Sequence, residues 1–319
     1  MSDKNRGEGE DGGSSNLLHG VTEWEPRSAL DIFFYYLYGA LLTNAKLVAV
    51  GLLVVILFTN ISLALAGLFL NPIVGGFAVV SVLPAGFIAV YVWESDPTAK
   101  RPALYIAVTF ALGTVATTFA YFLNSSSVGW FESLPVAPMA FFFFLFVGPI
   151  EEALKLGAVY VYPFDTDGFG TALDGAVFGA FAGLGFATAE NALYIATEGL
   201  ISGGGLGTVI GRAGVAPAHV MWSGIAGYYL GLAYVTKEYA GVLIFKGLVA
   251  VAVLHGTYNT FMTYAPLAVG IDAGEVAVQV VNFAFLIGFY AGVGYFLYSL
   301  VEGYRRAELE VGVREEGDL

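Results

Sequence analysis

The sequence predicts an all-α fold, a polytopic bundle of about eight transmembrane helices with both termini in the cytoplasm. Of its 319 residues, 57% are hydrophobic and 12% are charged, and the mean hydropathy is +0.75. Soluble domains carry about 25% charged residues, so this chain has too few polar side chains to cover a soluble surface. Apolar blocks run almost continuously from Leu47 to Leu300, which leaves no room for a second soluble core. We therefore expect one membrane domain over residues 47–300.

Eight stretches are each long enough to cross about 30 Å of hydrocarbon as a helix. The connectors between them contain Asn, Pro and Gly, which are typical of membrane turns. The expected spans are residues 47–70, 72–93, 102–123, 136–162, 171–197, 208–236, 241–264 and 275–300. The connector after the third span contains Asn124-Ser125-Ser126, a glycosylation-type sequence of low specificity.

Three segments lie outside the predicted membrane domain. Residues 1–28 are acidic, Gly-rich and poor in aliphatic side chains, which predicts a disordered cytoplasmic tail. Residues 29–46 are apolar but short and rich in Tyr, which favours an interfacial helix over a span. Residues 301–319 are charged, and we expect them to form a cytoplasmic C-terminal tail.

The distribution of Lys and Arg sets the expected orientation. The segments expected inside hold Lys46, Lys100, Arg101 and Lys237 besides the basic residues of both tails, whereas the three longer loops expected outside hold none. Basic residues in short loops stay on the cytoplasmic side of a membrane. The sequence therefore predicts a multi-pass protein of the cell membrane, with both termini inside.

Charge and cysteine content exclude several kinds of partner and site. The net charge of -13 argues against nucleic acid or anionic head groups as the main partner, so we expect no nucleic-acid binding. The absence of Cys from the sequence excludes thiol catalysis and Cys-ligated metals. Because His19 lies in the polar N-terminal segment, a histidine-built site must use the other two histidines, His219 and His255.

The fourth span carries ionisable residues about halfway along its length. A charged side chain costs about 3 kcal/mol or more at a helix centre unless it faces protein or water. Adjacent residues on a helix point about 100° apart, so one of Glu151 and Glu152 can face a cavity while the other faces a neighbouring helix. Glu151 and Lys155 are four residues apart and share a face, so they can form a buried ion pair. A structural pair is the alternative, but the second carboxylate has no local partner, and we favour a functional role.

Polar residues recur on the next three spans. Glu190 and Asn191 lie on the fifth span and His219 on the sixth, while His255 and Asn259 share one face of the seventh. A lone buried His is usually a core residue, and an isolated Glu can reach the outer interface. Two histidines at mid-depth, after a span with two glutamates, make coincidence a poorer explanation than either would alone. Tilted helices could bring these groups together around a cavity or leave them apart, because a sequence contains no distances between helices.

Other polar and small residues have structural interpretations. Arg212 and Lys246 lie near the ends of their spans, and we expect them to snorkel toward water. Asp174 lies where a helix N-cap is expected. Three glycines and an alanine recur every four residues and predict a smooth ridge for close helix packing. They are Gly175, Gly179, Gly183 and Ala187.

Together these motifs resemble the PrsW family of intramembrane proteases, which is related more distantly to the CAAX prenyl proteases and the Abi bacteriocin-immunity proteins. The resemblance covers about residues 145–260. Its motifs in order are Glu151-Glu152-x-x-Lys155, Phe186-x-x-x-Glu190 followed by Asn191, then His219, and finally His255-x-x-x-Asn259. In the wider superfamily the second motif more often ends in His, and Glu190 in that place is the PrsW-like variant. The last motif ends here in Asn259 rather than Asp.

The resemblance implies an intramembrane endopeptidase that hydrolyses a peptide bond of a membrane-anchored protein. Glu151 would take a proton from water, and Glu152 would support it or act as an accessory base. Glu190 and His219 would hold or polarise that water.

The remaining motif residues are implied to stabilise the reaction. His255 and Asn259 would donate hydrogen bonds to the oxyanion of the tetrahedral intermediate. Lys155 would pair with a glutamate of the first motif, and Asn191 would be accessory.

Two cofactor states remain open at this point. Glu151, Glu190, His219 and His255 could bind Zn²⁺, whose water would become the nucleophile. The sequence contains no HExxH-like local ligand pair, so such a site would depend on tertiary structure. We favour a water-only mechanism, because Asn259 shares a helical face with His255, a geometry that suits two hydrogen-bond donors.

Two other functions compete with proteolysis. A transporter or channel could use the same carboxylates and histidines as a proton or cation relay. Against it, the Glu-Glu pattern does not recur in the first half of the sequence, where an inverted repeat would place it. An inactive membrane scaffold is disfavoured, because loss of chemistry should remove some of these costly polar groups.

Overall fold

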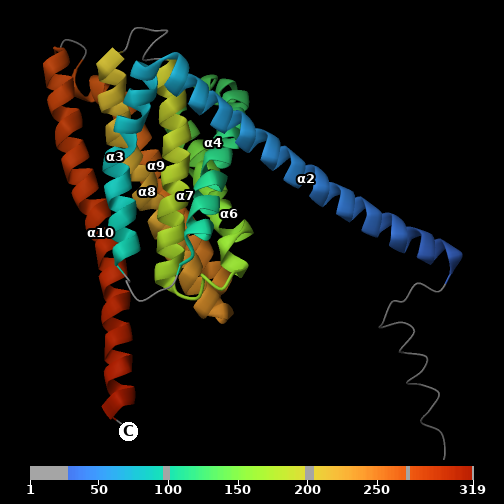
Figure 1. The fold of residues 1–319 in the computed structure, drawn as a ribbon. Helices are drawn as coiled ribbons and strands as arrows, with labels where there is room; N and C mark the ends of the chain where they lie inside the picture. The colour runs from blue at the N-terminus through green and yellow to red at the C-terminus, as the bar shows by residue number, and fades with distance from the viewer. Residues whose placement is uncertain (1–27, 96–100, 198–204, 271–273, 318–319) are drawn as a thin grey trace, which may run out of the picture. The chain divides into compact units, whose positions relative to one another are not determined.

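The computed structural model describes residues 28–95, 101–197, 205–270 and 274–317, and all regular secondary structure within them is helical. This confirms the predicted all-α class. The helices are α2 (Ala29–Leu70), α3 (Pro72–Glu94), α4 (Ala103–Glu132), α5 (Pro138–Phe142), the π-helical η1 (Phe143–Val147), α6 (Gly148–Val161), the 3-10 turn η2 (Pro163–Asp165), α7 (Ala172–Tyr194), α8 (Gly205–Val235), the 3-10 turn η4 (Lys237–Tyr239), α9 (Ala240–Val269) and α10 (Glu275–Gly317). Helices α3, α4 and α6 to α10 pack side by side in Figure 1.

Six helical segments of the described chain are long and apolar enough to cross a membrane. They are Ala29–Asn60, Gly75–Glu94, Ala103–Glu132, Ala172–Thr197, Lys237–Leu267 and Val276–Ala307. The other two expected spans correspond to α5–η1–α6 and to α8. These two segments carry charged residues, and α8 is enclosed by α3, α7 and α9, so it needs little apolar surface toward lipid. The side of the membrane on which each terminus lies stays a prediction.

The N-terminal part of the chain differs from expectation in one respect. The chain divides into two units between residues 55 and 56, and the first unit is described from residue 28 onward. In the first unit, the described residues form one continuous helix from Ala29 onward, with no break at residue 46. Whether residues 29–46 lie on the membrane or span it therefore stays a prediction. The tail predicted over residues 1–28 lies outside the described residues, except for Ser28.

Two helices of the second unit are longer than predicted. Helix α10 continues through residue 317, so most of the segment predicted as a C-terminal tail is helical. Its half-buried Glu302 lies 3.4 Å from Arg305 and 3.1 Å from Arg306, pairs at helical spacing that support this extension. Helix α4 continues to Glu132, which shortens the loop predicted over residues 124–135 to residues 133–137.

The predicted glycine ridge is present at the contact between α7 and α8. A Cβ atom at Gly175 would collide with the backbone oxygen of Gly227, and one at Gly183 would collide with that of His219. Only glycine lets the two backbones approach so closely. The close contact fixes α8 against α7 (Figure 1). It also brings His219 to Glu190, near the end of α7.

The start of α7 is fixed by a capping box and an ion pair. The Thr171 side chain accepts a hydrogen bond from the Asp174 backbone N–H, and the Asp174 carboxylate accepts one from the Thr171 backbone N–H. The capping role expected for Asp174 is thus present, with Thr171 at the N-cap itself. Arg101, expected in a loop, is buried and donates from Nε to Asp174 Oδ1 at 2.6 Å.

A π-helical turn precedes the two glutamates of α6. Residues Phe143–Val147 form this turn, and Gly148 and Pro149 follow it. The wider turn and the missing backbone N–H of Pro149 change the direction in which later side chains point. A Cβ at Gly148 would lie 2.7 Å from the Ala252 backbone oxygen, so glycine also lets α6 approach α9. Glu151 and Glu152 thereby come close to His255.

Candidate functional site

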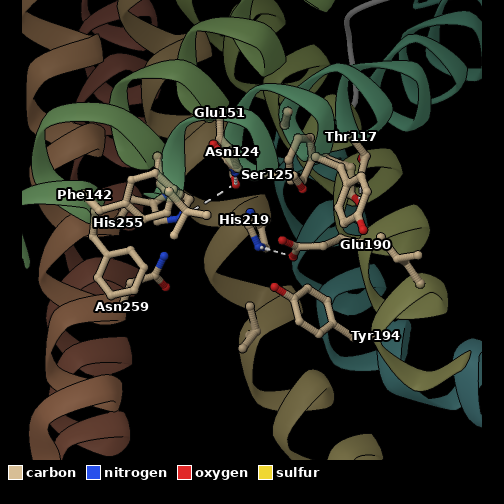
Figure 2. A pocket seen from close by; sticks show the side chains of 18 of the residues that line it. Thr117, Asn124, Ser125, Phe142, Glu151, Glu190, Tyr194, His219, His255 and Asn259 are labelled. Atoms are coloured by element: carbon tan, nitrogen blue, oxygen red, sulfur yellow. Dashed lines mark hydrogen bonds and ion pairs between the residues drawn. The ribbon is translucent and has the colours of Figure 1, made fainter. Parts of the chain in front are cut away.

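A cavity of about 390 Å³ lies among α4, α5, η1, α6, α7, α8 and α9. Five of the predicted site residues line it, and Figure 2 shows their side chains around one space. They are Glu151, Glu190, His219, His255 and Asn259. Asn124, Arg212 and several aromatic side chains complete the polar and apolar walls. The remaining predicted residues, Glu152, Lys155 and Asn191, are buried behind the lining.

Glu151 has one engaged and one unpaired carboxylate oxygen. Its Oε1 accepts a hydrogen bond from Asn124 Nδ2 at 2.8 Å. Its Oε2 is buried without a hydrogen-bond partner among the described residues, and it lies 3.8 Å from His255 Nε2. Of the two glutamates, Glu151 is therefore the one at the cavity, with an oxygen free to bind a further group.

Glu152 points away from the cavity and contacts two partners. Its Oε1 accepts from Lys155 Nζ at 2.6 Å and lies 2.7 Å from His255 Nδ1. The expected pairing of Lys155 with Glu151 through their shared face is therefore wrong. Lys155 pairs with Glu152, three residues earlier, because Glu151 turns toward Asn124 and the cavity.

Lys155 also contacts the second histidine. Its Nζ lies 3.1 Å from His219 Nδ1, and the other ring nitrogen, His219 Nε2, lies 3.0 Å from Glu190 Oε2. Lys155 Nζ lies 4.9 Å from the centre of the Phe186 ring, within cation–π range. The phenylalanine one turn before Glu190 thus covers the buried ammonium group.

Arg212 does not snorkel as expected. It forms an ion pair with Glu190, donates from Nε to Asn191 Oδ1 at 2.8 Å, and lies over the Tyr194 ring at 4.4 Å. Its side chain is 13% exposed. Glu190 on α7 faces Arg212 on α8, and its ion pair with the guanidinium is stronger than the contacts with water that a snorkelling side chain would make. Asn191 also donates to Ser81 Oγ at 2.9 Å, so it anchors this cluster to α3.

Sequence reasoning missed Asn124 as well as Arg212. Asn124 was expected in a loop, but it lies in α4 and bonds to Glu151. Asn259, by contrast, lines the cavity as expected, and its side chain makes no hydrogen bond to any described residue. Polar side chains within membrane helices usually face protein partners, and that rule applied to Asn124 and Arg212 would have found both.

These observations define a class: a multi-pass membrane protein with a buried cavity that combines carboxylates, histidines and amides suited to hydrolysis. The comparison with known families identifies the family within this class. The model described as "PrsW family intramembrane metalloprotease" matches residues 101–290, more than half of the chain, and the chain belongs to this family. It is an intramembrane protease of the cell membrane with a protein substrate in the membrane, as predicted. Membership favours the protease over the transporter or channel.

Curated relatives agree with this family. Protease PrsW of Bacillus subtilis is 30% identical over 195 residues, which cover 59% of this chain and 84% of the relative. Protease PrsW of Geobacillus kaustophilus is 28% identical over 179 residues, 56% of this chain and 76% of the relative. Protease PrsW of Shouchella clausii is 27% identical over 185 residues, 57% of this chain and 81% of the relative. No solved structure matches the chain significantly.

The family is described as metalloproteases, so the site residues can be compared with what a metal ion requires of its ligands. Across the described residues, no group of three or more His, Asp or Glu side chains is arranged to hold a metal ion. The four zinc candidates instead form two pairs, Glu190 with His219 and Glu151 with His255.

The contacts of each pair also argue against a bound metal. A metal-bound histidine normally donates its other N–H to an acceptor, but His219 Nδ1 faces the Lys155 ammonium, which is a donor. Glu190 is already neutralised by Arg212. The Glu151–His255 pair supplies two ligands, whereas catalytic zinc uses three protein ligands. The residues therefore do not fit a preformed metal centre.

Proposed function

We propose that this chain hydrolyses a peptide bond of a membrane-anchored protein with a water activated by Glu151. The observation that carries the proposal is the unpaired, buried Oε2 of Glu151 at the cavity wall. A carboxylate with one oxygen held by Asn124 and the other free can orient a water and accept its proton. General bases of this kind contribute about 10² to 10⁴-fold to rate.

The proposed reaction balances without a further reactant. The water oxygen forms a bond to the substrate carbonyl carbon, its proton moves to the Glu151–His255 pair, and the carbonyl electron pair moves to the oxygen. When the C–N bond breaks, the stored proton is delivered to the leaving nitrogen. The products are a carboxylic acid and an amine.

Asn259 is suited to stabilise the oxyanion of this reaction. Its amide lines the cavity one helical turn from His255, and it is not engaged by another described residue. A free, oriented N–H donor is what a developing oxyanion requires. His255 can add a second donor once it has accepted a proton.

The helix positions also support a side of the membrane for cleavage. Glu190 lies 16 residues after Asp174, about 24 Å along α7 from the end where Arg101 is buried. If Arg101 marks the cytoplasmic end, as predicted, the cavity lies in the outer half of the membrane. Glu151 lies ten residues before the end of α6 at Val161, about 15 Å along the helix, so the bond cut would lie between the middle of the membrane and its outer face.

The experiment that tests the proposal replaces the base while keeping its size. Glu151→Gln should abolish cleavage of a membrane-anchored reporter without reducing the amount of folded protein. Glu302→Gln is the matched control, because Glu302 lies on α10 outside the cavity and contacts only Arg305 and Arg306 among the described charged residues. Normal cleavage by the Glu151 variant would refute the assignment of the base.

A further inference from the structure

Lys155 occupies a position between the two glutamate–histidine pairs of the site. Its side chain is fully buried, and its Nζ lies 2.6 Å from Glu152 Oε1 and 3.1 Å from His219 Nδ1. An ordinary structural ion pair would need only the contact with Glu152. The contact with His219 is additional, and it has a chemical consequence for both histidines.

Hydrogen-bond donors and acceptors fix the tautomer of His219. A lysine ammonium group has three N–H donors and no acceptor. His219 Nδ1 can only accept from it, so this nitrogen carries no proton. The ring proton of His219 therefore lies on Nε2, which faces Glu190 Oε2 at 3.0 Å. The Glu190 carboxylate is paired with Arg212, and its oxygens can only accept hydrogen bonds.

The same reasoning gives His255 the opposite tautomer. Glu152 Oε1 accepts from Lys155, and an ionised carboxylate has only acceptors. His255 Nδ1, 2.7 Å away, must therefore donate to Glu152 and carry the proton. This leaves Nε2 as an acceptor facing the unpaired Oε2 of Glu151 at 3.8 Å. Trp222 stacks on the His255 ring at 4.6 Å and holds its plane.

We infer that Lys155 is a positioning residue that holds the two histidines in opposite tautomers, His219 as a donor to Glu190 and His255 as an acceptor beside Glu151. The inference rests on the proposed function. A separation of 3.8 Å lets one water lie within hydrogen-bond distance of both acceptors. By donating one O–H to Glu151 and one to His255, that water presents its lone pairs to the substrate carbonyl.

This arrangement assigns the two halves of the cavity different roles. His219 Nε2 already carries a proton and Glu190 is held by Arg212, so this pair does not take the proton of the water. The proton moves to the Glu151–His255 side instead. His255 is then an acceptor first and an oxyanion donor only after protonation, which refines the role that the family resemblance implied for it.

The test reads the tautomers directly, without relying on activity. The chain has three histidines, so His19→Ala leaves only His219 and His255. In protein labelled with ¹⁵N-histidine and held in lipid nanodiscs, ring ¹⁵N shifts and couplings separate a protonated from an unprotonated nitrogen. Adding His255→Asn leaves His219 alone, and adding His219→Asn leaves His255 alone. We expect an Nε2–H signal from His219 and an Nδ1–H signal from His255.

Variants of Lys155 then test whether this residue sets the tautomers. Lys155→Met removes the donor and should convert the His219 signal to a mixture of tautomers, with kcat lowered about tenfold or more. Lys155→Arg, which also only donates, should restore the single tautomer. Lys246→Met, at an exposed lysine that lies over the Tyr229 ring, is the matched control and should leave both signals unchanged.

Three outcomes would overturn the inference. They are one shared tautomer for both histidines, a doubly protonated His255 in the free enzyme, or an unchanged His219 signal in Lys155→Met. If Lys155→Met does not fold, the spectrum of the His19→Ala protein still decides the first two. A wrong tautomer with an inactive Glu151→Gln variant would refute only the role of Lys155, whereas an active Glu151→Gln variant would refute the proposed function itself.

Discussion

The two halves of the cavity differ in how completely their polar groups are paired. On the α7–α8 side, Glu190 contacts both Arg212 and His219, and Asn191 contacts Ser81 and Arg212. On the α6–α9 side, Glu151 keeps a free oxygen and the Asn259 amide is not engaged by other described residues. Saturated pairing fixes side chains, whereas an unpaired buried group costs free energy that only a ligand can recover. The comparison indicates that the first half is a frame and the second half is reactive.

Breaking the frame should cause the largest loss of stability. Arg212→Met leaves Glu190 as a buried carboxylate without its cation, which should cost about 3–5 kcal/mol in the free energy of unfolding. Thermal unfolding in detergent, monitored by tryptophan fluorescence, would measure it. Adding Glu190→Gln to Arg212→Met should recover much of the loss, because no unpaired charge then remains. Wild-type stability of the single variant would contradict the frame interpretation.

The same comparison explains which features the sequence could predict. The helices, the glycine ridge from Gly175 to Gly183 and the cap around Asp174 follow from local periodicity, and the structure contains all of them. The functional interpretation of the buried glutamates and histidines followed from the cost of burying charge in a membrane. Each of these inferences depends on the sequence of a single helix, or on a rule that holds for every membrane helix.

The pairings between helices could not be obtained in this way. Lys155 had two possible glutamate partners on its own helix, and the π-helical turn before α6 decides which one faces the cavity. Arg212 and Asn124 found partners on other helices, at distances that a sequence does not contain. The chemically decisive contacts are therefore the tertiary ones.

A substitution in the reactive half should reduce activity without reducing stability. Asn259→Ala removes a donor to the oxyanion and should lower kcat by about 10² to 10³-fold, with an unchanged unfolding temperature. Asn191→Ala should lower the unfolding temperature more than it lowers kcat, because it breaks contacts to Ser81 and Arg212. Measuring kcat and thermal unfolding for both variants sharpens the comparison. Loss of stability in Asn259→Ala would instead place this amide in the frame.

The smallest effect is expected from metal removal, and it decides between the two cofactor states. Because His219 Nδ1 faces the donor Lys155 and Glu190 is paired with Arg212, we expect a strong chelator to leave reporter cleavage within about twofold of the untreated enzyme. Elemental analysis of the same active preparation would measure bound zinc.

A zinc enzyme would behave differently in three linked measurements. Its active preparation would contain stoichiometric zinc, chelation would inactivate it reversibly, and His219→Ala and His255→Ala would each lower bound zinc together with activity, because ligands of one ion act as a unit. A water-only site makes His255→Ala resemble Asn259→Ala in kcat, with no change in metal content. Zinc lost along with activity in both histidine variants would require the two halves of the cavity to close around one ion, and the division into frame and reactive half would then be wrong.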